Sequence, residues 1–236
     1  MNQRPTTYTS LIAVALAMVL LAMPSSLLAN DDHDVQVYPR NSTPFGMTYG
    51  DWSAASWQWL FSLPVSSIPG LGGGDCLVGQ KSGPMFFAPA SFGEPLTISC
   101  TIPASKAIFI VLLSPECSTL EPPPFAGSNP QELRECAGGF ADGTDLNSLE
   151  LTVDGKPVRN LRRFRTQTPY FDFVMPASDN ILGQPGVTAG SSVADGYVVI
   201  LKPLPVGSHV IRFGGGWNSG PGAGFTARTT LNLTVE

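Results

Sequence analysis

The stretch that decides the fold spans residues 149–173 and reads LELTVDGKPVRNLRRFRTQTPYFDF. Its first five residues alternate apolar with polar side chains, a period of two that is typical of a strand with one buried and one solvated face. Asp154 and Gly155 follow at once. Asp-Gly between two strand-like runs predicts a type I′ hairpin, because both central positions of that turn need a positive φ. Pro157 cannot donate a hydrogen bond to a neighbouring strand, so we expect the returning strand to be short or at a sheet edge.

The second half of this stretch carries the densest positive charge in the chain, at Arg159, Arg162, Arg163 and Arg165. Guanidinium groups pair with carboxylate or phosphate through two parallel hydrogen bonds, so the cluster predicts an anion-binding site. The alternative is a solvated or ion-paired surface. Tyr170, just beyond the cluster, is the aromatic residue that we expect to join such a site. The chain has a net charge of −5 and few aromatic residues between the arginines, so we expect no nucleic-acid partner.

The N-terminus has the pattern of a secretory signal peptide. Arg4 is followed by an unbroken apolar run over residues 11–23 and by a small residue, Ala29, at the predicted cleavage site. The apolar run is too short for a comfortable transmembrane helix. We therefore expect residues 1–29 to be removed, no transmembrane segment to remain, and residues 30–236 to form one domain that is periplasmic or extracellular.

The composition indicates a β-rich domain with long loops. Only 13% of the residues are charged, and the chain contains 25 Gly and 22 Pro. Strand-like runs begin at Cys76, Met85 and Leu96, and AIFIVLL (107–113) is apolar on both faces, which predicts a central strand covered on both sides. Further alternating runs near the C-terminus predict a closing hairpin.

Four cysteines, all in the predicted exported part, indicate two disulfides. Three pairings are open, and we favour the sequential one, which joins Cys76 to Cys100 and Cys117 to Cys136. Each pair would close a loop of about 20 residues, worth roughly 3 kcal/mol in the chain-entropy account. Zinc is the rival ligand, but the spacing contains no Cys-x2-Cys pair.

Two segments predict helices. In residues 48–63, Thr48 and Asp51 form a capping-box pattern, and a stripe of aromatic residues follows at helical spacing. The stripe is either a sugar-binding platform or, as we favour, a face that docks on the sheet. The second, shorter helix begins at Asn129 and Pro130, a capping residue followed by proline at the first helical position, and carries Cys136.

Two groups of side chains raise the question of a metal. His33 lies among three acidic residues, and spaced acids and amides precede the central hairpin (Asp142, Asp145, Asn147 and Glu150). The first group is better interpreted as a frayed terminus. The second matches no EF-hand spacing. We therefore predict no metal and no cofactor.

Trp217 stands in a run dominated by glycine, residues 214–224. A tryptophan in a mobile loop is a candidate ligand contact. The same residue can instead fold back onto the domain as a plug, and both interpretations stay open. We include Trp217 with Tyr170 and the four arginines in the predicted ligand-binding set.

Several segments carry a resemblance to a known family: WQW (57–59), CLVGQKSGPMFF (76–87), SCTIPASKAIF (99–109), ELREC (132–136), DGKPVRNLRRFR (154–165), VADGYVVILKPL (193–204) and GSHVIRFGG (207–215). Together they make nearly the whole predicted exported chain resemble a family of exported bacterial proteins with no assigned activity. The last segment also resembles the closing hairpin of immunoglobulin-like bacterial surface domains. The resemblance implies an exported protein with an immunoglobulin-like C-terminal part, and it implies no catalytic residues.

The search for catalytic patterns finds no Gly-x-Ser-x-Gly and no His-Glu-x-x-His, and it leaves no free cysteine if both disulfides form. The fold that we expect is mainly β: an immunoglobulin-like antiparallel β-sandwich with one N-terminal amphipathic helix and a short second helix. The function that we expect is a non-catalytic binding module for an anionic envelope ligand: a glycan, a lipid head group or a partner protein. The alternatives are a structural or assembly protein of the envelope or secreted matrix, and a polymer-degrading hydrolase that uses a pair of acids.

Overall fold

The computed structural model describes residues 1–2, 35–80 and 82–236. Residues 3–29 of the predicted signal peptide and His33 lie outside the described residues. The contacts within the chain separate residues 1–32 from residues 33–236, and the fold below is that of the second unit.

One sheet is built around a single long strand, β9 (Ala189–Leu201). It pairs antiparallel with four others: β3 (Ala107–Leu113), β4 (Glu116–Ser118), β7 (Arg165–Gln167) and β8 (Phe171–Val174). The sixth strand, β1 (Met85–Phe87), lies parallel to β3. As expected for AIFIVLL, β3 is a central strand, with six of its seven residues buried.

The other sheet has the order β2-β11-β10-β5-β6. Its strands are β2 (Leu96–Ile102), β5 (Glu150–Val153), β6 (Lys156–Pro157), β10 (Gly207–Gly216) and β11 (Thr226–Val235). The predicted closing hairpin is the antiparallel β10–β11 pair, but β2 runs parallel to β11. The β-rich class is therefore confirmed, whereas both sheets are mixed rather than purely antiparallel.

The central hairpin forms as the sequence predicts. Asp154 and Gly155 have φ values of 53° and 78°, the positive values that a type I′ turn requires. The returning strand β6 has two residues and ends the sheet, which suits Pro157. The Asp154 carboxylate also accepts a hydrogen bond from the backbone N–H of Val210 at 2.8 Å, so the turn is fastened to β10.

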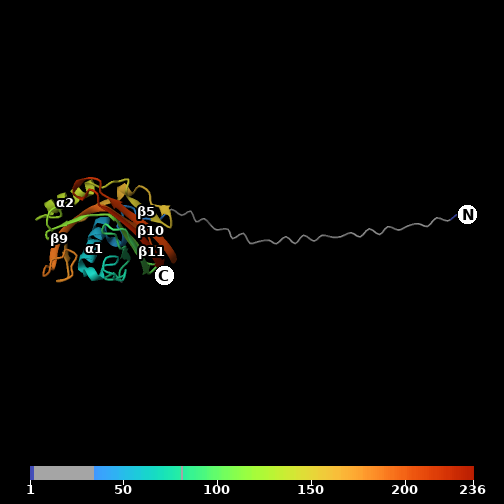
Figure 1. Cartoon of the computed structure of the whole chain (residues 1–236), viewed down its shortest axis with the longest axis horizontal. Coiled ribbons are helices and arrows are strands. Elements are labelled where there is room, and N and C mark those ends of the chain that lie inside the picture. The colour runs from blue at the N-terminus through green and yellow to red at the C-terminus, as the bar shows by residue number, and fades with distance from the viewer. Residues whose placement is uncertain (3–34, 81) are drawn as a thin grey trace. The chain divides into compact units, whose positions relative to one another are not determined.

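Both predicted helices are present. In α1 (Tyr49–Ser62), Thr48 and Asp51 close the capping box, and in α2 (Pro130–Asp142) the Asn129 side chain accepts from two backbone N–H groups. The helix α1 packs along β8 and β9, and in Figure 1 it lies between β9 and the β10–β11 pair. Four short 3-10 turns complete the helical elements: η1 (Pro44–Gly46), η2 (Val65–Ser67), η3 (Leu161–Phe164) and η4 (Gly220–Gly222).

The two sheets share one hydrophobic core, which includes β3, β9, β10 and β11 residues. The largest fully buried side chains include Phe109 of β3 and Phe213 of β10, one from each sheet. At roughly 25 cal/mol per Å² of apolar area, burial of such side chains is the main stabilising term of the fold.

Both disulfides have the predicted pairing. Cys76–Cys100 joins the loop before β1 to β2, and Cys117–Cys136 joins β4 to α2. They indicate an oxidising, non-cytoplasmic environment. No helix among the described residues is long and apolar enough to cross a membrane.

The prediction of a strand that begins at Cys76 is wrong. Residues 76–79 form turns instead. The Asp75 carboxylate accepts from the backbone N–H of Leu77, and the Gln80 side chain donates to the carbonyl of Cys76. These local side-chain bonds satisfy the backbone groups that a strand would have presented to a neighbour.

Candidate functional site

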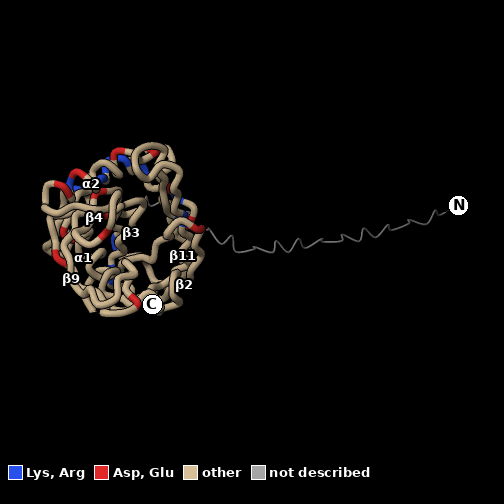
Figure 2. The backbone as a smooth tube through the Cα atoms, turned by 60° about the vertical axis from the view of Figure 1, so that its left-hand side comes forward, with Lys and Arg blue, Asp and Glu red and all other residues tan. Residues whose placement is uncertain are grey.

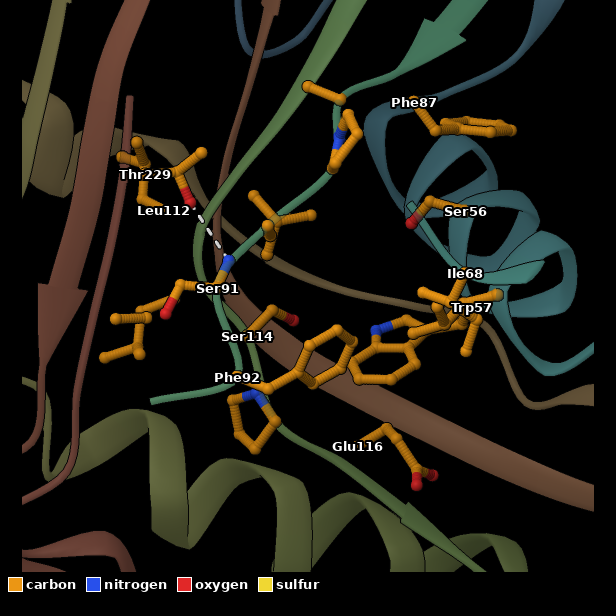
Figure 3. Close-up of a pocket in the computed structure, with 18 of the residues that line it drawn as sticks. Ser56, Trp57, Ile68, Phe87, Ser91, Phe92, Leu112, Ser114, Glu116 and Thr229 are labelled. Carbon is orange, nitrogen blue, oxygen red and sulfur yellow. Dashed lines mark hydrogen bonds between the residues drawn. The ribbon is translucent and has the colours of Figure 1, made fainter. Parts of the chain in front are cut away.

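One concave feature of the described residues is a pocket of about 370 Å³ whose walls come from both sheets and from α1. Figure 3 shows part of this wall, with Ser56 and Trp57 on α1, Leu112 on β3 and Thr229 on β11. The lining is mostly apolar and aromatic. Its volume falls within the range of small-molecule sites, roughly 300–1,000 Å³.

The helix α1 supplies one aromatic wall. Trp57 and Phe61 are one helical turn apart, with ring centroids 5.7 Å apart, and Phe61 stacks on Phe173 of β8 at 4.0 Å. Trp59 lies on another side of the helix, where it packs on Phe87 at 5.7 Å. Trp57 and Phe61 share a face because they are i,i+4 neighbours, and Trp59 on another side of the helix lines the same pocket.

The predicted docking of the aromatic stripe on the sheet is confirmed for Trp52, which is buried and packs on Phe87 of β1 with ring centroids 6.3 Å apart. Its Nε1 donates to the carbonyl of Pro44 at 2.9 Å. Trp59 is only half-buried, and its Nε1 donates to the carbonyl of Val78 at 2.8 Å. That bond fixes the indole as part of the pocket wall.

Trp217 supplies the wall at the other end. Its ring packs between Phe140 of α2, at 5.8 Å, and Phe225, at 4.9 Å, and Phe140 in turn stacks on Phe125. The neighbouring Gly222 is required here, because a Cβ at that position would lie 2.6 Å from the indole. The loop tryptophan therefore folds back onto the domain, as one of the two interpretations has it, and its ring lines the pocket. Its role as a ligand contact stays a prediction.

Two polar atoms in the pocket wall are buried without a hydrogen-bond partner: Oγ of Ser114 and Nε1 of Trp217. Buried polar atoms in folded proteins are nearly always bonded to protein or to water. By contrast, Thr229 in the same wall is satisfied, since its Oγ1 accepts from the backbone N–H of Ser91 at 2.9 Å (Figure 3).

Two carboxyl groups, Glu116 and Glu121, are the only charged residues of the pocket lining. Glu116 begins β4 and is 6% exposed. Its pKa is raised well above the ordinary value, first by burial and then by the hydrogen bond and negative charge of Glu121; the hydrogen bond donated by Ser192 acts in the opposite direction. Glu121 also accepts from Oγ of Ser118 at 2.9 Å. The pair has no basic partner among the described residues.

This pair was missed in the sequence. The signal was there, because Glu116 stands three residues after a continuous apolar strand and immediately before Cys117. An acid between a buried strand and a disulfide is itself expected to be buried. No pattern in the sequence predicts that Glu121 comes close to Glu116, because this depends on the path of the loop after β4.

Of the predicted ligand-binding arginines, Arg165 is committed to internal ion pairs. It donates to both carboxylate oxygens of Asp195, at 3.1 and 3.0 Å, and to Asp142 of α2 at 2.6 Å. These bonds join β7, β9 and α2. Figure 2 shows acidic and basic positions interspersed along α2, where Arg165 finds one of its partners.

The other three arginines lie on the turn that contains η3. Arg159, Arg162 and Arg163 are exposed, and none of them forms a salt bridge or a side-chain hydrogen bond within residues 35–80 and 82–236. We call these three residues the basic turn. Tyr170 is 39% exposed and precedes β8, and Trp217 is in the pocket wall. No ring contact or hydrogen bond joins either aromatic residue to the basic turn in that part of the chain.

A metal centre has no obvious place in the described residues, since no group of three or more His, Cys, Asp or Glu side chains comes together there. Asp142, part of the acid and amide series considered for calcium, is paired with Arg165. Asp145 caps the turn that precedes β5, accepting from the backbone N–H of Asn147 at 3.0 Å.

The acids of the pocket do not have the spacing of a glycosidase pair. Glu121 is close enough to Glu116 to raise its pKa, whereas glycoside hydrolases hold their two carboxyl groups roughly 5–10 Å apart. No family model, no curated protein and no solved structure matches the chain.

Proposed function

We propose that this protein is a non-catalytic binding module and that its main ligand is a small, largely apolar molecule held in the pocket between α1 and the two sheets. The observation that supports this most is an aromatic pocket of about 370 Å³ with a few polar side chains in an otherwise apolar lining. Binding sites typically combine an apolar lining with a few polar groups that orient the ligand.

Two residues of the pocket lining, Ser114 and Trp217, each have a polar atom that is buried without a hydrogen-bond partner. Ser114 Oγ can donate or accept a hydrogen bond, and Trp217 Nε1 can only donate. Leaving such a group buried and unbonded costs about 1–3 kcal/mol. Neither atom is accessible to a water-sized molecule in this structure, so each would meet a ligand only after its side chain moved.

We also propose that the protein is exported and that its two sheets are arranged as in an immunoglobulin-like domain. Two disulfides and a β-rich fold support them. The structural or assembly role gains no specific support from the described residues.

The anionic envelope ligand remains a second, separate candidate. It is favoured by the exposure of Arg159, Arg162 and Arg163 on one turn. A glycan or lipid head group would have to bind there on the surface, because the pocket itself contains acids and no base. Replacing Arg162 and Arg163 with Ala should then weaken binding to an anionic glycan such as heparin, and raised salt should do the same.

The pocket proposal is tested with a neutral apolar dye, Nile red, whose emission rises on entry into an apolar site. Trp57, Trp59 and Trp217 line the pocket, so their fluorescence should change in the same titration. Ser114→Leu should fill the pocket and lower the affinity of the protein for the dye at least ten-fold. Ser208→Leu is the matched control, since Ser208 is exposed on β10 and should leave binding unchanged.

Thermal unfolding of both variants shows whether they remain folded. If Ser114→Leu does not fold, Ala90→Leu in another part of the lining replaces it. Saturable dye binding that both pocket variants leave intact would contradict the proposal, as would the absence of saturable binding in the wild-type protein.

A further inference from the structure

The two carboxyl groups in the pocket point to a more specific ligand. We propose that the pocket selects an apolar amine, and that Glu116 and Glu121 together are the counter-ion of its ammonium group. This inference rests on the proposed function, because it concerns the same pocket.

The first step is the charge of the lining. Glu116 and Glu121 are the only ionisable residues there, and neither has an Arg, Lys or His partner among the described residues. Buried acids in proteins are normally paired with a base or with several donors, because desolvation otherwise disfavours the charged form. Here the donors are Ser192, which donates to Glu116, and Ser118, which donates to Glu121. The basic partner is what the pair lacks.

The second step is the cost of keeping the pair. The raised pKa of Glu116 means that burial and Glu121 disfavour its charged form in the free protein, so ionisation of this carboxyl costs the fold stability. Such an arrangement is typical of sites where a ligand completes the charge balance. An ammonium group would reverse the effect of Glu121, since two carboxylates that repel each other both attract a cation placed between them.

The third step is the hydrogen-bonding capacity. An alkylammonium has three donors and no acceptor. The pocket offers acceptors in the two carboxyl groups of its lining. In Figure 3, Ser114, Phe92, Trp57 and Glu116 surround the same part of the pocket.

The fourth step is the apolar part of the site. The lining rings include Trp57, Phe125 and Trp217, and aromatic faces attract cations that approach within about 6 Å of a ring centre. The rings also accommodate the hydrocarbon body of an amphiphile. An anion such as a fatty acid would instead place a second negative charge beside the two carboxyl groups, where the low dielectric of an apolar pocket makes repulsion strong.

The experiment compares three probes with the same ten-carbon chain: decylamine, decanol and decanoate. Each displaces Nile red from the protein at pH 7 and physiological salt. We expect decylamine to bind at least ten-fold more tightly than decanol, a difference of about 1.4 kcal/mol, and decanoate to bind most weakly.

The variant Glu116→Gln/Glu121→Gln keeps the shape of the pocket and removes its charge. It should bring decylamine affinity to within three-fold of that of decanol, while decanol binding changes less than three-fold. Glu135→Gln is the control, because Glu135 is exposed on α2 and does not line the pocket. It removes an acidic charge and should leave the preference for the amine unchanged.

The outcomes separate this inference from the proposed function. Equal binding of amine and alcohol, or an amine preference that survives the double Gln variant, overturns the amine inference while the pocket remains a binding site. Failure of Nile red and all three probes to bind overturns both.

Discussion

Arg165 donates two hydrogen bonds to the carboxylate of Asp195, one from Nε at 3.1 Å and one from Nη2 at 3.0 Å. Asp195 is only 4% exposed, so this arginine neutralises a charge that the fold has buried. The residue predicted as a ligand contact thus has an internal structural partner, and its third bond, to Asp142, fastens α2 to the sheet.

Arg165→Ala should therefore destabilise the protein by on the order of 2–3 kcal/mol, because Asp195 would be left buried without its partner. Urea unfolding followed by circular dichroism measures the change. Arg162→Ala removes the same type of side chain from the exposed basic turn and should change the unfolding free energy by less than about 0.5 kcal/mol. Equal effects of the two substitutions would contradict this assignment.

The disulfide between Cys117 and Cys136 should control the stability of α2. Its replacement by Cys117→Ala/Cys136→Ala is expected to cost roughly 3 kcal/mol in the chain-entropy account. Hydrogen exchange should show α2 opening more readily, because the bond joins that helix to β4.

The matched control is Cys76→Ala/Cys100→Ala, which opens a loop of similar size, 24 residues against 19. It should cost a similar amount of stability and leave the exchange of α2 amides slower than in the first variant. Identical exchange patterns in the two variants would show that neither bond acts locally.

The parts of the fold that the sequence predicts well depend on near neighbours along the chain. The hairpin follows from Asp154-Gly155, the helix starts follow from Thr48 and Asn129, and the central strand follows from seven consecutive apolar residues. Each rule involves residues within a few positions of one another, so it survives without knowledge of tertiary contacts.

The parts that were missed depend on distant partners. Arg165 meets Asp195 thirty residues away, and the parallel pairing of β2 with β11 joins Leu96 to Thr229, 133 residues away (229 − 96). The pocket brings α1, β3 and the loop of Trp217 to one place. A cluster of arginines suggests a binding site because the sequence does not show which of them has an acidic partner within the fold. It therefore cannot distinguish the ion-paired Arg165 from the three exposed arginines beside it.

The pair of His209 and Asp154 should make stability depend on pH near neutrality. Nδ1 of His209 lies 2.7 Å from the Asp154 carboxylate and Nε2 lies 2.9 Å from the carbonyl of Pro205, so the doubly protonated ring satisfies both acceptors. Burial lowers the pKa of His209, but the hydrogen bonds to Asp154 and Pro205 outweigh it and the net pKa is raised.

A raised pKa in the folded state stabilises the protein fully below the unfolded value, about 6.5, and the contribution is lost as the pH rises through the folded value. Asp154→Asn keeps a residue that tolerates positive φ and can still accept from Val210, but it removes the charge. We expect the variant to be less stable than the wild type by about 0.5–1 kcal/mol at pH 6 and nearly equal at pH 9. Urea unfolding at both pH values measures this, and a difference independent of pH would contradict it.

Glu116 should also make the free energy of unfolding depend on pH. Burial raises its pKa first, and Glu121 raises it further, against the opposing hydrogen bond from Ser192. An acid whose pKa is higher in the folded state stabilises the protein fully below its unfolded value, about 4.5, and that stability is lost as the pH rises through the folded value.

Wild-type unfolding free energy should therefore fall with rising pH relative to Glu116→Gln, whose amide can still accept from Ser192 and cannot ionise. The difference between the two proteins, measured by urea unfolding from pH 4 to pH 9, isolates Glu116 from His209, which both retain. Glu150→Gln, at an exposed position on β5, should run parallel to the wild type. A constant difference between wild type and Glu116→Gln would mean that Glu116 titrates at the same pH in the folded and unfolded chains.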